Sequence, residues 1–215
     1  MASYAVKEMF LTLQGEGMQV GRRAVFLRFA GCNLWSGREA DRATADCTFC
    51  DTDFVGLDGD KGGRYGDAEA LADGAAELWQ AGLEENGAKP FVVITGGEPL
   101  LQLDDALIAA LKARGFEVAV ETNGTVAAPA GLDWICVSPK RGTEIVQRRG
   151  DELKVVYPQP GLDLKTLEEW DFRHFLVSPM DGPHFADARD AAVRFVLAHP
   201  RWRLSTQTHK VIGIR

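Results

Sequence analysis

The sequence predicts an α/β fold built around a mostly parallel sheet. Short apolar runs, such as residues 91–95, are typical of strands buried on both faces, and they alternate with segments whose apolar residues recur at helical spacing. Strand–helix–strand repetition implies right-handed crossovers, which bring successive strands side by side in parallel. The predicted strands are 24–29, 91–95, 116–120, 134–137, 152–157, 173–177 and a stretch near Trp202.

Three segments carry the helical pattern. They cover residues 67–85, residues 103–114 before Gly115, and residues 187–198 before Pro200. Residues 56–66 are rich in glycine and aspartate, which predicts a solvated loop. The 215 residues suffice for one well-packed domain, and the sequence has no internal repeat or linker, so we expect a single domain over 1–215.

The charge distribution favours a small-molecule substrate. The formal net charge is −7 with acidic and basic residues interspersed, and the sequence lacks the basic patch typical of nucleic-acid-binding proteins. No apolar run approaches the roughly 20 residues that span a membrane. The first ten residues also lack the apolar core of a signal peptide. We therefore expect no nucleic-acid partner, no membrane association and a cytoplasmic location.

Unusual short sequences follow the predicted strands. Because ligands of parallel sheets bind beyond the carboxyl ends of the strands, these sequences should converge on one active-site mouth. They are Gly31-Cys32 and residues 95–99, 121–124, 138–140 and 178–180.

Three of the four cysteines, Cys32, Cys47 and Cys50, lie within nineteen residues. In a cytosolic chain such clustering argues for metal binding rather than for disulfides. Structural zinc prefers four ligands, whereas three thiolates on an iron–sulfur cluster would leave one iron open to another ligand. The cysteines alone favour a cluster only slightly over zinc with a histidine ligand. The fourth, Cys136, lies inside a predicted strand, where we expect it to pack in the core.

A second motif, Thr95-Gly96-Gly97-Glu98-Pro99, follows a predicted buried strand. Two glycines allow a ligand to approach the backbone closely, and a carboxylate beside exposed backbone groups suits an amino group. The alternative is an ordinary strand-to-helix turn in which Pro99 begins the next helix.

The cysteine triad and the Gly-Gly-Glu-Pro motif together resemble the radical S-adenosylmethionine (SAM) superfamily. The resemblance implies a partial (β/α) barrel, reduced in helices, that holds a 4Fe–4S cluster on Cys32, Cys47 and Cys50. It also implies that SAM chelates the open iron and yields a 5′-deoxyadenosyl radical. The residues implied to bind SAM are Phe49, Gly96, Gly97, Glu98, Ser138, Pro139, Lys140 and, on a weaker match, Glu121.

Four further segments, 10–17, Arg28, 50–52 and 206–210, resemble the 7-carboxy-7-deazaguanine synthase family of the queuosine pathway. The resemblance implies that 6-carboxy-5,6,7,8-tetrahydropterin is converted to 7-carboxy-7-deazaguanine by ring contraction. Ammonia is lost in this reaction, Mg²⁺ assists, and SAM is regenerated. No residue is implied to act directly as an acid or base. A flavodoxin or ferredoxin as electron donor and a homodimer are implied as well.

The resemblance also implies roles for individual residues. The substrate carboxylate suits the guanidinium of Arg28, and the N–H edge of the pterin suits acceptors such as Glu16. Thr52 is implied to contact Mg²⁺. The residues implied to bind substrate are Gln14, Gly15, Glu16, Arg28, Thr95 and His209.

Ordinary structural roles stay open for several of these residues. Gln14 and Glu16 fit a polar turn, and Thr52 fits a cap on the next turn. Lys140 fits a surface lysine, and His209 fits a loosely ordered tail.

The cysteine spacing C-x14-C-x2-C departs from the C-x3-C-x2-C that is usual in the superfamily. Widening the closed loop from about 4 to about 15 residues costs only about 1.2 kcal/mol, roughly a tenth of a typical metal-binding free energy. We therefore expect an insertion over about 33–46 with a small helix at 38–45, near the surface where the reductase docks. The alternative functions are a small radical SAM activase of a glycyl radical enzyme and a non-enzymatic zinc- or cluster-binding module.

Overall fold

The computed structural model describes residues 3–84 and 87–215, which form one nine-stranded sheet in the order β3-β1-β2-β4-β5-β6-β7-β8-β9. The strands are β1 (Tyr4–Leu13), β2 (Arg23–Phe29), β3 (Gly63–Tyr65), β4 (Phe91–Gly96), β5 (Glu117–Thr122), β6 (Trp134–Val137), β7 (Arg149–Tyr157), β8 (Asp171–Pro179) and β9 (Trp202–Leu204). The helices are α1 (Ala68–Gln80), α2 (Asp105–Ala113), α3 (Leu164–Leu167), α4 (Phe185–Ala198) and α5 (Thr208–Ile212).

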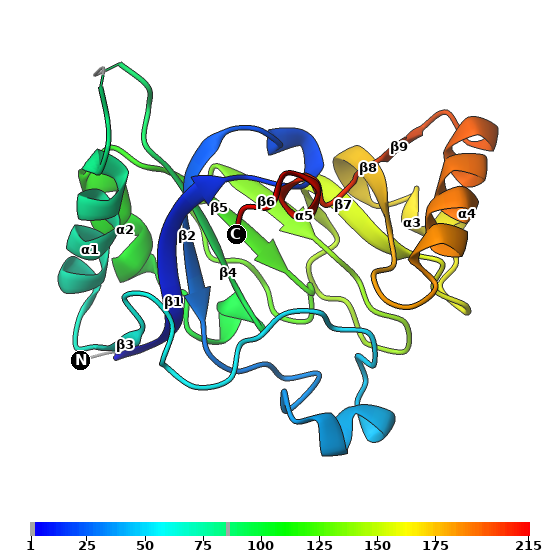
Figure 1. Ribbon diagram of the computed structural model, residues 1–215, viewed down its shortest axis with the longest axis horizontal. Helices are drawn as coiled ribbons and strands as arrows, with labels where there is room; N and C mark the ends of the chain where they lie inside the picture. The colour runs from blue at the N-terminus through cyan, green and yellow to red at the C-terminus, as the bar shows by residue number, and fades with distance from the viewer. Residues whose placement is uncertain (1–2, 85–86) are drawn as a thin grey trace.

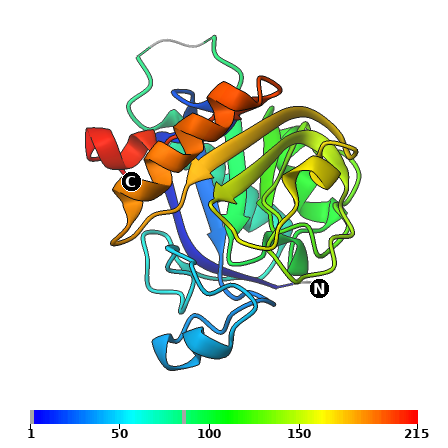
Figure 2. The same cartoon turned by 90° about the vertical axis from the view of Figure 1, so that its right-hand side faces the viewer.

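The sheet is parallel from β2 to β9, and an antiparallel pair of strands closes one end. β1 runs antiparallel to both β2 and β3, whereas each later strand runs parallel to its neighbour. The sheet curves around a concave face (Figure 2), with α1 and α2 at one end and α3 and α4 at the other (Figure 1). This mixed α/β sheet with few helices confirms the predicted fold class.

Two apolar clusters hold helices against the convex face. The larger joins β1, β2, β4 and β5 to α1 and α2, and the smaller joins β6, β7, β8 and β9 to α4 and α3. Alternation along the strands explains this division, because successive residues point to opposite faces of a sheet. In β7, for example, Leu153 and Val155 enter the smaller cluster, whereas Glu152 and Lys154 point to the concave face.

The loops 123–133 and 138–148 join parallel strands without a helix, so no crossover helix follows β5 or β6 on the convex face. None of the helices in the described ranges is long and apolar enough to cross a membrane.

Several elements differ from those that the sequence predicts. β1 was not predicted, and β3 lies within the predicted solvated loop 56–66. β1 pairs on both sides and is irregular between Val6 and Glu8, so its apolar residues do not alternate strictly. The first helix ends at Gln80 rather than at 85, because Gly82 has a left-handed φ of 65°. Position 85 itself lies outside the described residues. The small helix expected at 38–45 is a 3₁₀ helix over Glu39–Thr44.

Candidate active site

Two adjoining recesses open at the carboxyl ends of the parallel strands. The deeper recess encloses about 1040 Å³ including its mouth, and the outer recess about 800 Å³, which is ample for small-molecule ligands. The residues that line both recesses are Glu16, Asp51, Thr52, Thr95, Glu121 and Gln207. The strand ends therefore converge on one active-site mouth, as the unusual short sequences after the predicted strands indicate.

The three clustered cysteines line the deeper recess. Cys32 follows β2, and its Sγ accepts a hydrogen bond from the backbone N–H of Leu34 at 3.4 Å. The neighbouring thiol of Cys47 lowers the pKa of Cys50 to about 6, and the interaction with Cys50, together with burial, raises the pKa of Cys47. Within residues 3–84 and 87–215, no three His, Cys, Asp or Glu side chains are arranged to hold a single metal ion. An iron–sulfur cluster does not need three such side chains around one ion, because each of its cysteines binds a different iron.

The insertion over 33–46 folds back onto the cysteine loop. Arg42 lies over the Trp35 ring at 4.1 Å and donates to the backbone carbonyls of Thr48 and Cys50, each at 3.1 Å. Trp35 in turn packs edge-on against Phe54, with ring centroids 5.6 Å apart. The inserted residues therefore stabilise the turn that carries Cys47 and Cys50.

The two glycines after β4 bring its end against the end of β2. A Cβ on Gly97 would overlap the carbonyl oxygen of Gly31 and the Cβ of Cys32, and a Cβ on Gly96 would overlap the backbone of Phe29. Both glycines line the deeper recess. They are needed for the close approach of two strands that places Cys32 beside this backbone.

Glu98 does not line either recess. Its carboxylate is fully buried, with Oε1 accepting from the Thr122 hydroxyl at 2.7 Å and the Leu100 N–H at 2.9 Å, and Oε2 accepting from the Asn123 N–H at 2.8 Å. Glu98 also caps the short 3₁₀ helix that begins at Pro99. Its carboxylate therefore joins the ends of β4 and β5.

Ser138 and Lys140 line the deeper recess, whereas Pro139 is buried behind it. Lys140 Nζ donates to the carbonyl and the hydroxyl oxygens of Ser138, both at 2.7 Å, and lies 5.9 Å from the centre of the Phe49 ring. Burial lowers the pKa of Lys140. Lys140 is thus part of the recess wall rather than a solvated surface lysine.

Arg28 and Thr95 are neighbours across β2 and β4, and both line the outer recess. Arg28 Nε donates to Glu8 Oε1 at 2.8 Å from the adjacent strand. Arg28 is half-buried and lies on the same recess as Gln14, Gly15 and Glu16.

The C-terminal segment crosses the outer recess. The Thr208 N–H donates to the carbonyl of Gly15 at 2.9 Å, and His209 packs directly over Gly15. Figure 1 shows α5 in front of the concave face of the sheet. All six residues predicted to bind substrate therefore line the outer recess: Gln14, Gly15, Glu16, Arg28, Thr95 and His209.

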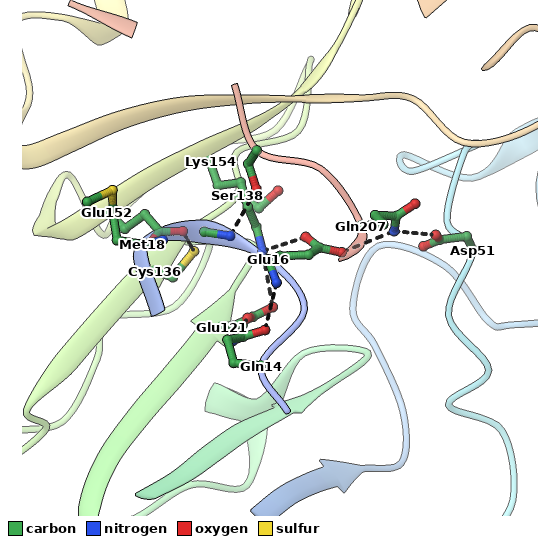
Figure 3. Close-up of polar contacts among 12 residues, drawn as sticks. Gln14, Glu16, Met18, Asp51, Glu121, Cys136, Ser138, Glu152, Lys154 and Gln207 are labelled. Atoms are coloured by element: carbon green, nitrogen blue, oxygen red, sulfur yellow. Dashed lines mark hydrogen bonds and ion pairs between the residues drawn. The ribbon is translucent and has the colours of Figure 1, made fainter. Parts of the chain in front are cut away.

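Five functional candidates were missed in the sequence: Asp51, Cys136, Glu152, Lys154 and Gln207. Gln207 Nε2 donates to Glu16 Oε1 at 3.0 Å and to Asp51 Oδ2 at 3.1 Å (Figure 3). Cys136 is buried as predicted, but it lines the deeper recess and its thiol lies 3.4 Å from Glu152 Oε1. The alternation of Glu152 and Lys154 within an apolar strand was a usable signal, because it places two charges on one face.

The family model of the radical SAM superfamily matches residues 41–154, which is more than half of the chain. The chain therefore belongs to the radical SAM superfamily.

Close relatives narrow the family further. The chain is 63% identical to a 7-carboxy-7-deazaguanine synthase of Bradyrhizobium diazoefficiens, with 99% of this chain and 100% of that protein covered. It is 40% identical to a 7-carboxy-7-deazaguanine synthase of Bacteroides thetaiotaomicron, with 98% of each chain covered. The crystal structure of QueE from Escherichia coli superposes with a TM-score of 0.69 at 29% identity, covering 96% of this chain and 95% of that one. The chain belongs to the family of 7-carboxy-7-deazaguanine synthases.

Proposed function

We propose that this enzyme converts 6-carboxy-5,6,7,8-tetrahydropterin to 7-carboxy-7-deazaguanine by radical ring contraction, with loss of ammonia. The observation that carries the proposal is the joining of two recesses with different chemistry. Thiols and glycine backbone line the deeper recess, and a guanidinium, carboxylates and amides line the outer one. Family membership supports the same conclusion, because the curated relatives carry the name of this activity.

The deeper recess fits a 4Fe–4S cluster and SAM. Cys32, Cys47 and Cys50 would bind three irons, while Gly96 and Gly97 would offer backbone groups to the methionine part of SAM. Phe49, Ser138 and Lys140 line the same wall and would contact the remainder of SAM. Cluster and SAM, when bound, supply the radical that abstracts a hydrogen atom from the substrate; the chain's own residues orient the substrate and exclude water.

The outer recess fits the pterin. Arg28 would receive the substrate carboxylate, since a guanidinium pairs with a carboxylate through two parallel hydrogen bonds. Glu16 would accept from the N–H groups of the pterin edge. Burial acts to raise the pKa of Glu16, but the Lys154 ammonium, together with the Gln207 amide and the His209 side chain, holds the pKa below its usual range. Glu16 therefore stays an ionised acceptor at neutral pH.

Thr52 would bind Mg²⁺ at the boundary of the two recesses. Its side chain lines both of them, and its hydroxyl is a hard oxygen of the kind that Mg²⁺ prefers. The Asp51 carboxylate next to it is already hydrogen-bonded to Gln207 and Lys210. Substrate oxygens and water would therefore complete the coordination. A flavodoxin or ferredoxin as electron donor, a homodimer and a single domain over 1–215 belong to the same proposal.

An anaerobic turnover assay tests the proposed function. The reconstituted full-length enzyme, given SAM, Mg²⁺, a reductant and 6-carboxytetrahydropterin, should form a product with the absorbance of 7-carboxy-7-deazaguanine and release ammonia. Iron and sulfide analysis of the same preparation is the control. A preparation with full iron and sulfide but no deazaguanine product would contradict the proposal and favour an activase, which needs a protein partner.

A further inference from the structure

Two charged side chains of β7, Glu152 and Lys154, point into the concave interior of the sheet. Glu152 is 2% exposed and Lys154 is 6% exposed, whereas Leu153 and Val155 between them enter the apolar cluster on the other face. Charged side chains are almost never this buried unless they are paired. Apolar residues in place of a buried ion pair are often equally stable, so the fold alone does not explain these charges.

Lys154 joins two carboxylates from separate segments of the chain. Its Nζ lies 2.8 Å from Glu16 Oε2, in the turn after β1, and 3.4 Å from Glu121 Oε2, near the end of β5 (Figure 3). The second oxygen of each carboxylate accepts from an amide, because Gln207 donates to Glu16 Oε1 at 3.0 Å and Gln14 donates to Glu121 Oε1 at 2.8 Å. Both carboxylates are thus fixed in position, and both line the two recesses.

Glu152 fixes the backbone that follows Glu16. Its Oε2 accepts from the Met18 N–H at 2.9 Å, and the Gly17 N–H donates to the Ser205 hydroxyl at 2.9 Å. Gly17 has a φ of 70°, and a Cβ at this position would overlap the Glu152 carboxylate. β7 therefore holds the turn in two places, through its backbone by Glu152 and through the Glu16 side chain by Lys154.

We infer that Lys154 is a positioning residue for the substrate, which acts by aligning Glu16 and Glu121 as charged acceptors for the N–H groups of the bound pterin. The inference rests on the proposed function and extends it to a residue outside the motifs that identify the family. One lysine facing Glu16, Glu121 and Glu152 leaves an excess of acceptors. Such an excess suits an uncharged edge of a ligand that is rich in N–H donors, as the pterin edge remote from the carboxylate is.

The charge of Lys154 also predicts how substrate binding depends on pH. The charged or titratable groups that face Glu16 are Lys154, Glu121, Glu152, His209 and, through Gln207, Asp51. Burial acts to raise the pKa of Glu16, and the Lys154 ammonium is the largest of the influences that together lower it. Without the ammonium, burial and the neighbouring carboxylates would raise this pKa. Glu16 would then take up a proton as the pH falls and would lose its role as an acceptor.

The test is a binding titration with the full-length, anaerobically reconstituted enzyme in the presence of SAM and without reductant. The probe is 6-carboxypterin, the fluorescent oxidised form of the substrate. Lys154→Met should weaken binding about 30-fold or more near neutral pH, because truncating one partner of a buried, hydrogen-bonded charge pair typically costs at least that much. The loss should grow as the pH is lowered, whereas wild-type affinity should change little over the same range.

A double-mutant cycle separates positioning from a direct contact. If Lys154 acts partly through Glu16, adding Lys154→Met to Glu16→Gln should weaken binding by a clearly smaller factor than Lys154→Met weakens it in the wild-type enzyme. The matched control is Lys61→Met, which removes an exposed lysine whose Nζ lies 2.8 Å from Glu77 and should leave binding unchanged. Unchanged binding by Lys154→Met, or fully additive losses in the cycle, would overturn the inference.

Two measurements keep the test decisive. If Lys154→Met does not fold, the binding of the double variant is compared with that of Glu16→Gln alone. The double variant should fold more readily than Lys154→Met, because it buries one uncompensated carboxylate fewer than Lys154→Met does. If the wild-type enzyme does not bind 6-carboxypterin, the turnover assay alone decides the proposed function. The coupling of the two residues is then read from thermal unfolding, where the double variant should be more stable than Lys154→Met, and an equal or lower stability would overturn the inference.

Discussion

His209 packs over Gly15 so closely that a Cβ on residue 15 would overlap the imidazole ring. The neighbouring Thr208 N–H donates to the carbonyl of Gly15 at 2.9 Å, so the C-terminal segment is held on the turn that carries Gln14 and Glu16. The lack of a side chain at position 15 is therefore what allows the C-terminal segment to lie across the outer recess.

Replacing Gly15→Ala should displace His209 and weaken substrate binding. The added methyl group has no room, and overpacking of this kind typically costs about 1–3 kcal/mol. If that free energy is lost from the closed position of His209 over the substrate, KM should rise about 5- to 150-fold. Steady-state kinetics under anaerobic conditions measure this effect. Gly66→Ala is the control, because no atom of residues 3–84 and 87–215 lies within 4 Å of a Cβ there and KM should be unchanged. Equal KM values for both variants would show that His209 does not take part in substrate binding.

The four cysteines should divide into three cluster ligands and one that is not a ligand. Cys32→Ala should lose iron and sulfide after anaerobic reconstitution, whereas Cys136→Ala should keep the wild-type content of both, because the Cys136 thiol contacts Glu152 instead. Chemical analysis of iron and sulfide per chain measures the outcome. Loss of the cluster in Cys136→Ala, or its retention in Cys32→Ala, would contradict the assignment.

The parallel part of the sheet could be predicted because its strands are buried on both faces and are apolar throughout. β4 is the clearest case, since its first five residues are buried. β1 was missed because it pairs with β2 on one side and with the short β3 on the other, and its irregularity between Val6 and Glu8 breaks the alternation. Long-range pairing of this kind leaves no signal in local propensity.

Residues in recognisable motifs could be placed in the site from the sequence, whereas their supporting partners could not. Glu98 shows the limit, because the motif predicts a carboxylate that meets a ligand, whereas the carboxylate is used within the protein by Leu100, Thr122 and Asn123. Gln207 lies 191 residues from Glu16 along the chain. Contacts over such separations depend on how the sheet curves, which short-range patterns do not encode.

Glu98→Ala should destabilise the protein by about 2–4 kcal/mol, because it leaves buried N–H groups of Leu100 and Asn123 without partners. Urea unfolding of the protein without its cluster measures the change in the free energy of unfolding. Glu77→Ala serves as the control, since among the described residues this exposed carboxylate pairs only with the half-exposed Lys61, and its loss should cost less than about 1 kcal/mol. A Glu98→Ala variant as stable as this control would show that the carboxylate does not hold β4 and β5 together.

Arg22 and Glu117 form a pair across β4 that should make stability depend on pH. Arg22 donates to both carboxylate oxygens of Glu117 at 3.0 and 3.1 Å and lies 3.9 Å from the centre of the Phe91 ring in the strand between them. The hydrogen bonds from Arg22 hold the pKa of Glu117 below its ordinary value despite partial burial. A carboxylate with a lowered folded-state pKa stabilises the protein above its unfolded-state pKa of about 4.3, and this stabilisation is lost as the pH falls through the folded-state value.

Glu117→Gln should therefore lower the free energy of unfolding by about 1 kcal/mol at neutral pH. The difference from wild type should shrink as the pH is lowered below about 4, as urea unfolding at several pH values would measure. A difference that stays constant across this pH range would mean that the ion pair is not its source.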